Sequence, residues 1–460
     1  MDFNVEKYNE DIIRETRNLV RIKSVKEPGK KGAPFGDGIR KSLDYTLDLC
    51  NKLGFKTKNL DGYLGYAEYG QGDDLVAILV HLDVVPEGNG WTKEPYGGEV
   101  IDGKMYGRGV NDDKGAAISS IYALKSIMDS GLKMNKRFRI IFGCDEEQGW
   151  EDIRYYLDHE EKPTCGFSPD GPFPIVNTEK GILRLKLKKD IGSQDSSNIR
   201  VISLVGGDRP NMVPEEATCL LKINKYTNSV KTYLNNFTEH NLEITENEDG
   251  ISIRTKGKSA HGSEPYLGVN AIVKMISILT NLEDIDEDLY SFLNFIDSYI
   301  GSDVKGEKFK IDFQDEVSGF LTLNPGVLNY DGKSVHVTLD IRYPVTFKGD
   351  YIVSKITEKA LKNNIEVELL EDKEPLFIDE DNPLIQKLKN AYERVTGNKA
   401  ELISLKGGTY ARAIDNAVAF GPIMPGKEDT AHQEDEYLEI DDLLISAKIY
   451  AQAVYELNNN

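Results

Sequence analysis

Two short apolar runs constrain the fold of this chain more than any other feature of its sequence. The runs are Leu75–Val80 and Phe138–Cys144, and both have the length of a buried strand. Between them, apolar residues recur with helical spacing over 116–127, and Gly131 follows as a stop signal. Strands that alternate with helices favour a largely parallel sheet with helices on both faces. We therefore predict an α/β fold for this part of the chain.

The pattern changes near residue 180. Leu183, Leu185 and Leu187 alternate with basic residues, which is the period of a half-exposed strand. Similar alternation at Val335–Ile341 and a helical stretch at Val269–Leu279 indicate an antiparallel sheet with helices on one face. Since 460 residues are too many for one ordinary core, we predict two domains. Residues 181–374 form an inserted α+β domain, and residues 1–180 and 375–460 together form the first domain.

Composition excludes several classes of partner. The chain carries 77 acidic and 56 basic side chains, a formal charge of −21, which repels the phosphates of nucleic acids. The N-terminal residues show no secretory signal, and no apolar run approaches the ~20 residues that span a bilayer. The four cysteines are widely spaced and form no CxxC pair, as is typical of a reduced compartment. We expect a cytoplasmic protein without nucleic-acid or membrane partners.

Potential metal ligands follow the predicted strands. His81-Leu-Asp83 comes directly after the first apolar run, and Asp145-Glu-Glu147 comes after the second. Further candidates are Asp112, Asp170 and His432. Because the carboxyl ends of parallel strands meet at one edge of a sheet, we expect these side chains to converge. Carboxylates and imidazoles in this number suit a pair of divalent ions, so the sequence predicts a metal-dependent hydrolase.

Each of these motifs also has an ordinary structural explanation. His81 alone could be a buried structural histidine, and Asp112-Asp113 could be a turn followed by a helix N-cap. Asp145-Glu-Glu147 could be a solvated loop, Asp170 a simple turn residue and His432 an exposed side chain. Their joint occurrence, with strands placed to gather them, favours the metal site.

The motifs also resemble a known family. His81-Leu-Asp83, Gly107–Gly115, Asp145–Gly149, Ser168–Asp170 and Ala431-His432 resemble, in the same order, the motifs of dinuclear-zinc peptidases and aminoacylases. More specifically, His81–Pro86 with Trp91, Phe167–Gly171, Glu179–Gly181 and Gly407–Arg412 resemble the peptidase V branch of dipeptidases. The resemblance covers nearly the whole chain. It implies a catalytic domain with an inserted lid domain.

The resemblance also implies roles for individual residues. His81 and Asp170 would bind one ion, Glu147 and His432 the other, and Asp112 would bridge the two. Glu146 would be the general base and acid, and Asp83 would orient His81. A cis peptide is implied between Asp112 and Asp113. Zinc is the first expectation for both ions, with manganese or cobalt as alternatives.

Residues of the predicted lid would contact the substrate. The resemblance implies that His261 stabilises the transition state and that Arg342 holds the C-terminal carboxylate of the substrate. Asn211 is a further candidate contact, and Gly407-Gly408 would allow close approach of the backbone. A turn histidine, a strand arginine and a plain glycine turn are the alternative explanations.

We therefore expect hydrolysis of small unblocked peptides, above all dipeptides. The alternative within enzymes is an N-acyl-amino-acid amidohydrolase of the aminoacylase or desuccinylase type, because the expected ligand set is common to both. A non-catalytic peptide- or metal-binding module is a third possibility, against which the presence of Glu146 argues. The length of the insertion resembles the peptidase V arrangement and predicts a monomer.

Overall fold

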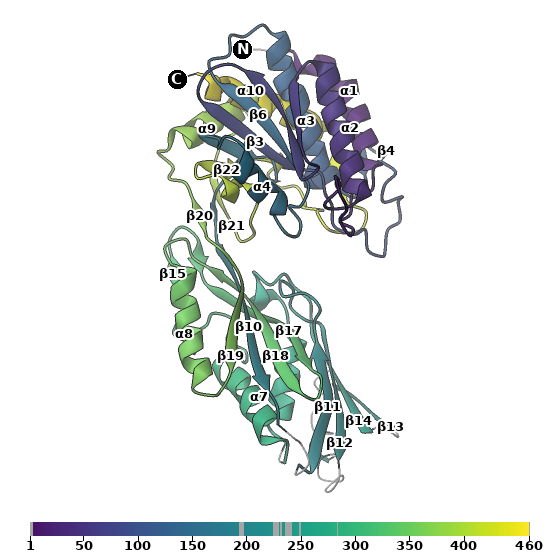
Figure 1. Cartoon of the computed structure of the whole chain (residues 1–460), viewed down its shortest axis with the longest axis vertical. Helices are drawn as coiled ribbons and strands as arrows, with labels where there is room; N and C mark the ends of the chain where they lie inside the picture. Colours follow the sequence, from purple (N-terminus) through teal and green to yellow (C-terminus); the bar gives the residue numbers. More distant parts are fainter. Residues whose placement is uncertain are drawn as a thin grey trace. The chain divides into compact units, whose positions relative to one another are not determined.

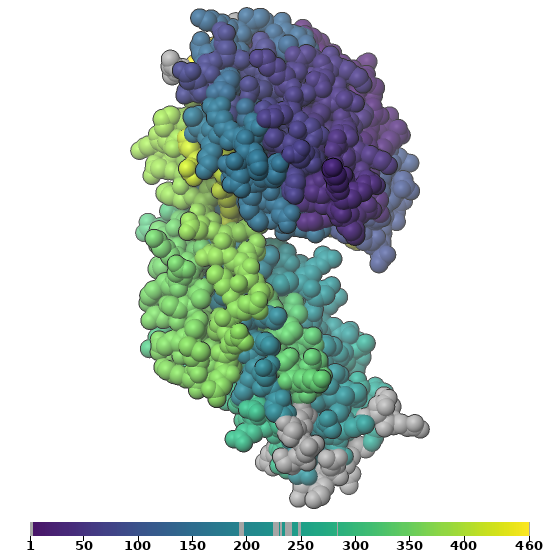
Figure 2. Space-filling model, in the orientation of Figure 1, coloured from purple at the N-terminus to yellow at the C-terminus, as the bar shows by residue number. Residues whose placement is uncertain are grey.

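The computed structural model describes residues 3–192, 197–223, 230, 232–234, 242–247, 250–282 and 284–459. It divides into two compact units (Figure 1). The first unit comprises Met1–Thr178, Phe377–Ser404 and Gly408–Asn460, and the second comprises Glu179–Leu376 and Leu405–Gly407. In the space-filling view, the purple and blue N-terminal segments share the first unit with a yellow C-terminal segment (Figure 2). The second unit is thus an insertion in the sequence of the first.

The first unit is built on one large sheet. Its strand order is β1 (Lys56–Leu60), β2 (Leu64–Gly70), β6 (Arg137–Gly143), β3 (Leu75–His81), β7 (Cys165–Ser168), β22 (Ala417–Ala419), β9 (Ile175–Glu179) and β20 (Leu376–Phe377), with β21 (Leu402–Leu405) pairing with β9. The central strands β6, β3, β7 and β22 are parallel. Every residue of β3 is buried, as expected for a parallel strand covered on both faces.

Helices surround this sheet. They are α1 (Asn9–Val20), α2 (Asp37–Leu53), α3 (Gly115–Asp129), α4 (Glu151–His159), α9 (Pro383–Thr396) and α10 (Ile440–Asn458). Helix α3 packs against β3, β6 and α10, so almost all of its residues are buried. Helices α2 and α9 end at Gly54 and Gly397, which adopt left-handed conformations with φ of 95° and 73°. The predicted α/β architecture is confirmed.

Shorter elements complete the first unit. A three-stranded sheet contains β24 (Tyr437–Glu439), β5 (Lys104–Tyr106) and β4 (Glu99–Ile101), and a two-stranded sheet contains β23 (Pro422–Ile423) and β8 (Gly171–Pro172). At the N-terminal side of α1, Val5–Tyr8 forms a separate 3-10 turn. No helix within the described ranges is both long enough and apolar enough for a bilayer crossing.

The second unit is an antiparallel sheet with helices. Its strand order is β13 (Leu242–Asn247), β14 (Gly250–Lys256), β12 (Glu216–Ile223), β11 (Ile199–Gly206), β17 (Thr322–Tyr330), β18 (Ser334–Tyr343), β10 (Gly181–Asp190) and β19 (Glu366–Lys373). Its helices include α6 (Ala271–Leu279), α7 (Glu287–Tyr299) and α8 (Gly349–Leu361), and a small hairpin joins β15 (Gln314–Asp315) to β16 (Gly319–Phe320). The predicted α+β class is therefore confirmed.

Alternating residues of these strands form the core of the second unit. Leu183, Leu185 and Leu187 are fully buried and pack in one apolar cluster with residues of α6, α7 and α8. Helix α6 begins two residues later than its apolar pattern suggests. The reason is Asn270, whose side chain accepts hydrogen bonds from the N–H groups of Ile272 and Val273 and so caps the helix.

Candidate metal centre

Three neighbouring parallel strands of the first unit deliver candidate ligands to one edge of the sheet. Strand β3 ends at His81, β6 ends just before Cys144–Glu147, and β7 ends just before Asp170. Because β3 lies between β6 and β7 in the sheet, the side chains that follow these strands converge. This is the arrangement that the strand-end pattern of the sequence predicts.

The remaining two candidates come from segments outside the sheet. Asp112 lies in the irregular turn Val110–Lys114 that leads into α3, with φ of −130° and ψ of 93°. The peptide between Asp112 and Asp113 is cis, as the family resemblance implies. His432 lies in the loop between β23 and β24 and has a positive φ of 64°, a conformation that non-glycine residues rarely adopt.

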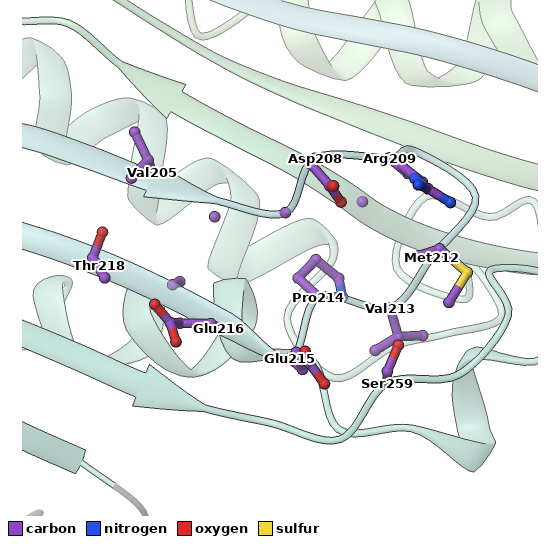
Figure 3. A pocket seen from close by; sticks show the side chains of 14 residues that line it. Val205, Asp208, Arg209, Met212, Val213, Pro214, Glu215, Glu216, Thr218 and Ser259 are labelled. Atoms are coloured by element: carbon purple, nitrogen blue, oxygen red, sulfur yellow. The ribbon is translucent and has the colours of Figure 1, made fainter. Parts of the chain in front are cut away.

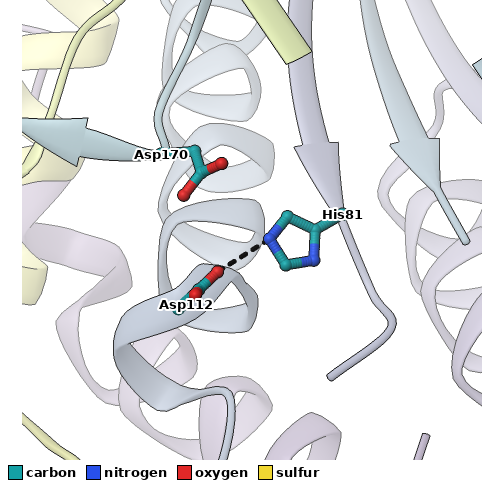
Figure 4. A group of neighbouring side chains, drawn as sticks. All are labelled: His81, Asp112 and Asp170. Atoms are coloured by element: carbon teal, nitrogen blue, oxygen red, sulfur yellow. Dashed lines mark hydrogen bonds and ion pairs between the residues drawn. The ribbon is translucent and has the colours of Figure 1, made fainter. Parts of the chain in front are cut away.

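These side chains form two groups that share Asp112. One group is His81, Asp112 and Asp170, and the other is Asp112, Glu147 and His432; within each, the potential ligand atoms lie within 4.8 Å of one another. Asp112 Oδ1 lies 2.7 Å from His81 Nε2, and its Oδ2 lies 3.0 Å from His432 Nε2. Figure 4 shows Asp112 and Asp170 directed toward the His81 ring at the end of β3. The carboxylate of Asp112 therefore connects the two groups.

The charge of the site suits cations. Burial raises the pKa of the Glu146 carboxyl well above its usual value, and the negative charges of Asp170 and Glu147 add to the effect. Burial opposes a positive charge on His432, but hydrogen bonds to Asp112 and Glu147 outweigh it and raise its pKa to about 11. Imidazole nitrogens and carboxylate oxygens without thiolates are donors that zinc and manganese accept. The residues of both groups thus fit divalent ions.

Asp83 contacts both neighbouring strand ends. His81 Nδ1 lies 3.0 Å from the main-chain carbonyl oxygen of Asp83. Because a carbonyl can only accept, Nδ1 carries the proton in this bond, and Nε2 is left as the ligand atom. The Asp83 carboxylate accepts hydrogen bonds from the N–H groups of Glu146 and Glu147, at 3.2 and 3.1 Å. Asp83 therefore orients His81 through its main-chain carbonyl. Its carboxylate holds the loop Asp145–Glu147, which we call the acidic loop.

A buried network that the sequence analysis missed supports the same acidic loop. The Asp152 carboxylate accepts hydrogen bonds from the N–H groups of Cys144 and Asp145 and from the hydroxyl of Tyr410. A Cβ atom on Gly143 would come within 2.3 Å of the Tyr410 ring, so only glycine fits at this end of β6. Trp150 Nε1 donates a hydrogen bond of 2.8 Å to the Glu146 carbonyl. Tyr410 lies in the predicted Gly407–Arg412 motif, which was a usable signal, whereas Asp152 lies in none.

The predicted substrate-contacting residues Asn211 and His261 lie on adjoining loops of the second unit. The Asn211 carbonyl accepts a 2.6 Å hydrogen bond from Gly262 N–H. His261 is exposed, and its Nδ1 lies 2.6 Å from Ser263 Oγ and 3.3 Å from Ser263 N. Since an N–H group can only donate, Nδ1 is an acceptor, and the neutral ring carries its proton on Nε2. His261 is thus presented as a hydrogen-bond donor.

Arg342, on β18, is largely paired inside the second unit. Its side chain is only 3% exposed; Nε and Nη2 donate to the Asp340 carboxylate at 2.6 and 3.0 Å, and Nη1 donates to the Lys406 carbonyl at 3.2 Å. A guanidinium has five N–H donors, so these three bonds leave two. Gly407 belongs to the second unit and Gly408 to the first.

A pocket lies beside the Asn211 loop. It has a volume of about 500 Å³, and its lining includes Asp208, Arg209, Met212, Glu215 and Ser259 (Figure 3). Its lining includes none of the candidate metal ligands.

In this protein, imidazoles and carboxylates converge at the strand ends of a parallel sheet. This combination of fold and site is that of a metal-dependent hydrolase. A family model described as "Peptidase family M20/M25/M40" matches residues 77–456. The chain belongs to this family and is a metallopeptidase, a hydrolase that acts on peptide bonds.

Relatives match over the full length. The chain is 42% identical to "Putative dipeptidase YtjP" of Bacillus subtilis (strain 168), covering 99% of this chain and 100% of that protein. It is 34% identical to "Putative dipeptidase SH1171" of Staphylococcus haemolyticus (strain JCSC1435), covering 98% of each. Among solved structures, human carnosine dipeptidase 1 has a TM-score of 0.60 at 14% identity, covering 99% of this chain and 98% of that one. The Saccharomyces cerevisiae di-peptidase Dug1p has a TM-score of 0.58 at 14% identity, covering 100% of both. These structures share the fold.

Proposed function

We propose that this metallopeptidase hydrolyses dipeptides with a free amino group. The observation that carries the proposal is that the two groups of potential metal ligands share Asp112. Glu146 lies beside them, in the loop that follows β6 at the same edge of the sheet. The names of the full-length relatives, which are called dipeptidases, support the choice of substrate. We further propose that the first unit is the catalytic domain and the second its lid.

Five residues would hold two divalent ions: His81 and Asp170 on one, Glu147 and His432 on the other, and Asp112 on both. Two such ions, when bound, polarise a substrate carbonyl and lower the pKa of water beside them. Zinc is our first choice, with manganese and cobalt as alternatives, because the donors are nitrogen and oxygen atoms.

Glu146 is the proposed general base and acid. Its burial among other carboxylates raises the pKa of its carboxyl, which makes the carboxylate a stronger base toward a proton. Glu146 takes a proton from the attacking water and delivers it to the nitrogen of the leaving amine. Asp83 accepts the main-chain N–H of Glu146, and Trp150 donates to its carbonyl. The backbone that carries the Glu146 side chain is therefore held in place.

Residues of the lid are proposed to recognise the substrate. His261 would donate its Nε2 proton to the oxygen that becomes negative in the transition state. Arg342 would use its two remaining N–H donors for the C-terminal carboxylate. Asn211 would contact the substrate, and Gly407 and Gly408 would let it approach the backbone. We propose that the protein works as a monomer in the cytoplasm.

A substrate panel tests the proposed function. Purified protein is supplied with zinc, manganese or cobalt and assayed with dipeptides, tripeptides, N-acetyl amino acids and N-succinyl amino acids. We expect kcat/KM to be highest for dipeptides. A preference for N-acyl amino acids would replace the proposal with an amidohydrolase of the aminoacylase type, and a stable dimer in light scattering would contradict the monomer.

A further inference from the structure

A buried carboxylate outside the proposed ligand set holds the segment that carries Asp112. Glu436 is fully buried. Its Oε1 accepts hydrogen bonds from the main-chain N–H groups of Gly109, Asn111 and Asp112, at 3.0, 3.0 and 3.3 Å. Its Oε2 accepts a 2.6 Å bond from Arg108 Nη1, so the charge is paired as well as hydrogen-bonded.

The local backbone explains why a side chain is needed there. Asp112 has φ of −130°, which is not helical, inside the turn Val110–Lys114. An N–H group at an irregular turn has no partner from a regular helix, and leaving such a group buried and unpaired is costly. Glu436 supplies one acceptor for three of these groups. The turn therefore depends on a residue more than 300 positions away in the sequence.

The same carboxylate belongs to the segment that carries His432. Glu436 follows His432 by four residues and precedes β24, which pairs with β5. Two further bonds tie this segment to the Asp112 turn: Gly107 N–H donates to the Glu436 carbonyl at 2.9 Å, and Asn111 Nδ2 donates to Asp429 Oδ1 at 3.2 Å. Glu436 thus fixes the distance between a turn and a loop that each carry a proposed ligand.

We propose that Glu436 is a positioning residue for the metal centre. It fixes the position of Asp112 relative to His432. This inference rests on the proposed two-metal site. Because Asp112 belongs to both ligand groups, displacing its turn weakens both ions together. Loss of His432, which belongs to one group, weakens one ion. The two variants therefore have different signatures in metal binding.

Metal titration of the full chain tests the proposal. Metal-free wild type, Glu436→Ala and His432→Ala are titrated with zinc in competition with a chromophoric chelator, which gives an affinity for each ion without an activity assay. Circular dichroism of the metal-free proteins reports whether they are folded. The matched control is Glu434→Ala, because Glu434 is exposed in the same loop and the change removes the same side chain and charge.

We expect Glu436→Ala, which removes the acceptor of all three N–H groups, to bind both ions about 10–100-fold more weakly, the range seen when a group supporting metal ligands is lost. We expect His432→Ala to lose one ion and Glu434→Ala to match the wild type. If Glu436→Ala does not fold, Glu436→Asp is measured in its place, because it keeps the charge beside Arg108 but is too short to reach all three N–H groups.

The outcomes separate this inference from the proposed function. A wild type that binds two ions and a folded Glu436 variant with unchanged affinities would overturn the role of Glu436 alone. A wild type that binds fewer than two ions would overturn the two-metal site itself, and this inference with it.

Discussion

His81 Nδ1 lies 3.0 Å from the main-chain carbonyl oxygen of Asp83 but 3.6 Å from its carboxylate oxygen Oδ1. The histidine is therefore oriented mainly by the backbone of Asp83. The carboxylate of Asp83 has a separate task, because it accepts the N–H groups of Glu146 and Glu147.

Replacing Asp83 should separate these two tasks. In Asp83→Ala the main-chain carbonyl remains, so we expect His81 to keep its tautomer and the protein to keep both ions, bound more weakly. We expect kcat to fall about 10–100-fold, because the acidic loop loses its support. Elemental analysis and dipeptide kinetics check this prediction. Complete loss of one ion would contradict this prediction.

Replacing Glu146 should remove catalysis without removing metal. Glu146→Gln keeps the size of the side chain but cannot take a proton, and general acid–base groups typically contribute about 10²–10⁴-fold in rate. We expect a fall in kcat of that order with two ions still bound. Glu151→Gln serves as a control, since Glu151 is exposed at the start of α4. Full turnover by Glu146→Gln would rule out the proposed mechanism.

Replacing single ligands should distinguish the two ion positions. His81 and His432 belong to different groups, and Asp112 belongs to both. We predict that His81→Ala and His432→Ala each retain one ion, whereas Asp112→Ala retains none at stoichiometric metal. The metal-to-protein ratio after gel filtration measures this directly, and identical ratios for all three variants would argue against a shared Asp112.

His261 should be a hydrogen-bond donor through Nε2. The hydroxyl and the N–H group of Ser263 both lie at His261 Nδ1, and we expect ¹⁵N chemical shifts to show the Nε2–H tautomer at neutral pH. Ser263→Ala keeps the N–H group and removes the hydroxyl. One lost hydrogen bond of about 1 kcal/mol corresponds to roughly a fivefold lower kcat, with KM little changed. An Nδ1–H tautomer in the wild type would contradict the proposed role of His261.

The sequence predicted β3, β6 and the candidate ligands at their ends because both depend on local pattern. Strand β3 is apolar from Leu75 to Val80 because it is buried on both faces, and His81 is its last residue. The outer hairpin of β1 and β2 was not predicted. Its first strand has mixed polarity at the edge of the sheet, with only Leu60 buried, so its sequence carries little signal.

The supporting residues could not be predicted for a different reason. Glu436 and Asp152 mainly bind main-chain N–H groups, and every residue except proline has such a group. Which N–H groups lack a partner depends on the turns of the folded chain. Glu436 stands in an acidic stretch with Glu434 and Asp435, and only the structure distinguishes the buried carboxylate from its exposed neighbour.

The central claim is dipeptide hydrolysis by a two-metal site. It is tested most directly by the initial rate of dialanine hydrolysis as metal-stripped protein is refilled with known equivalents of zinc, and then of manganese and cobalt. We predict no turnover in the stripped protein and, with at least one of these metals, a rate that rises and reaches its plateau at two equivalents per chain. Undiminished hydrolysis by the stripped protein, or a plateau at one equivalent, would contradict the claim.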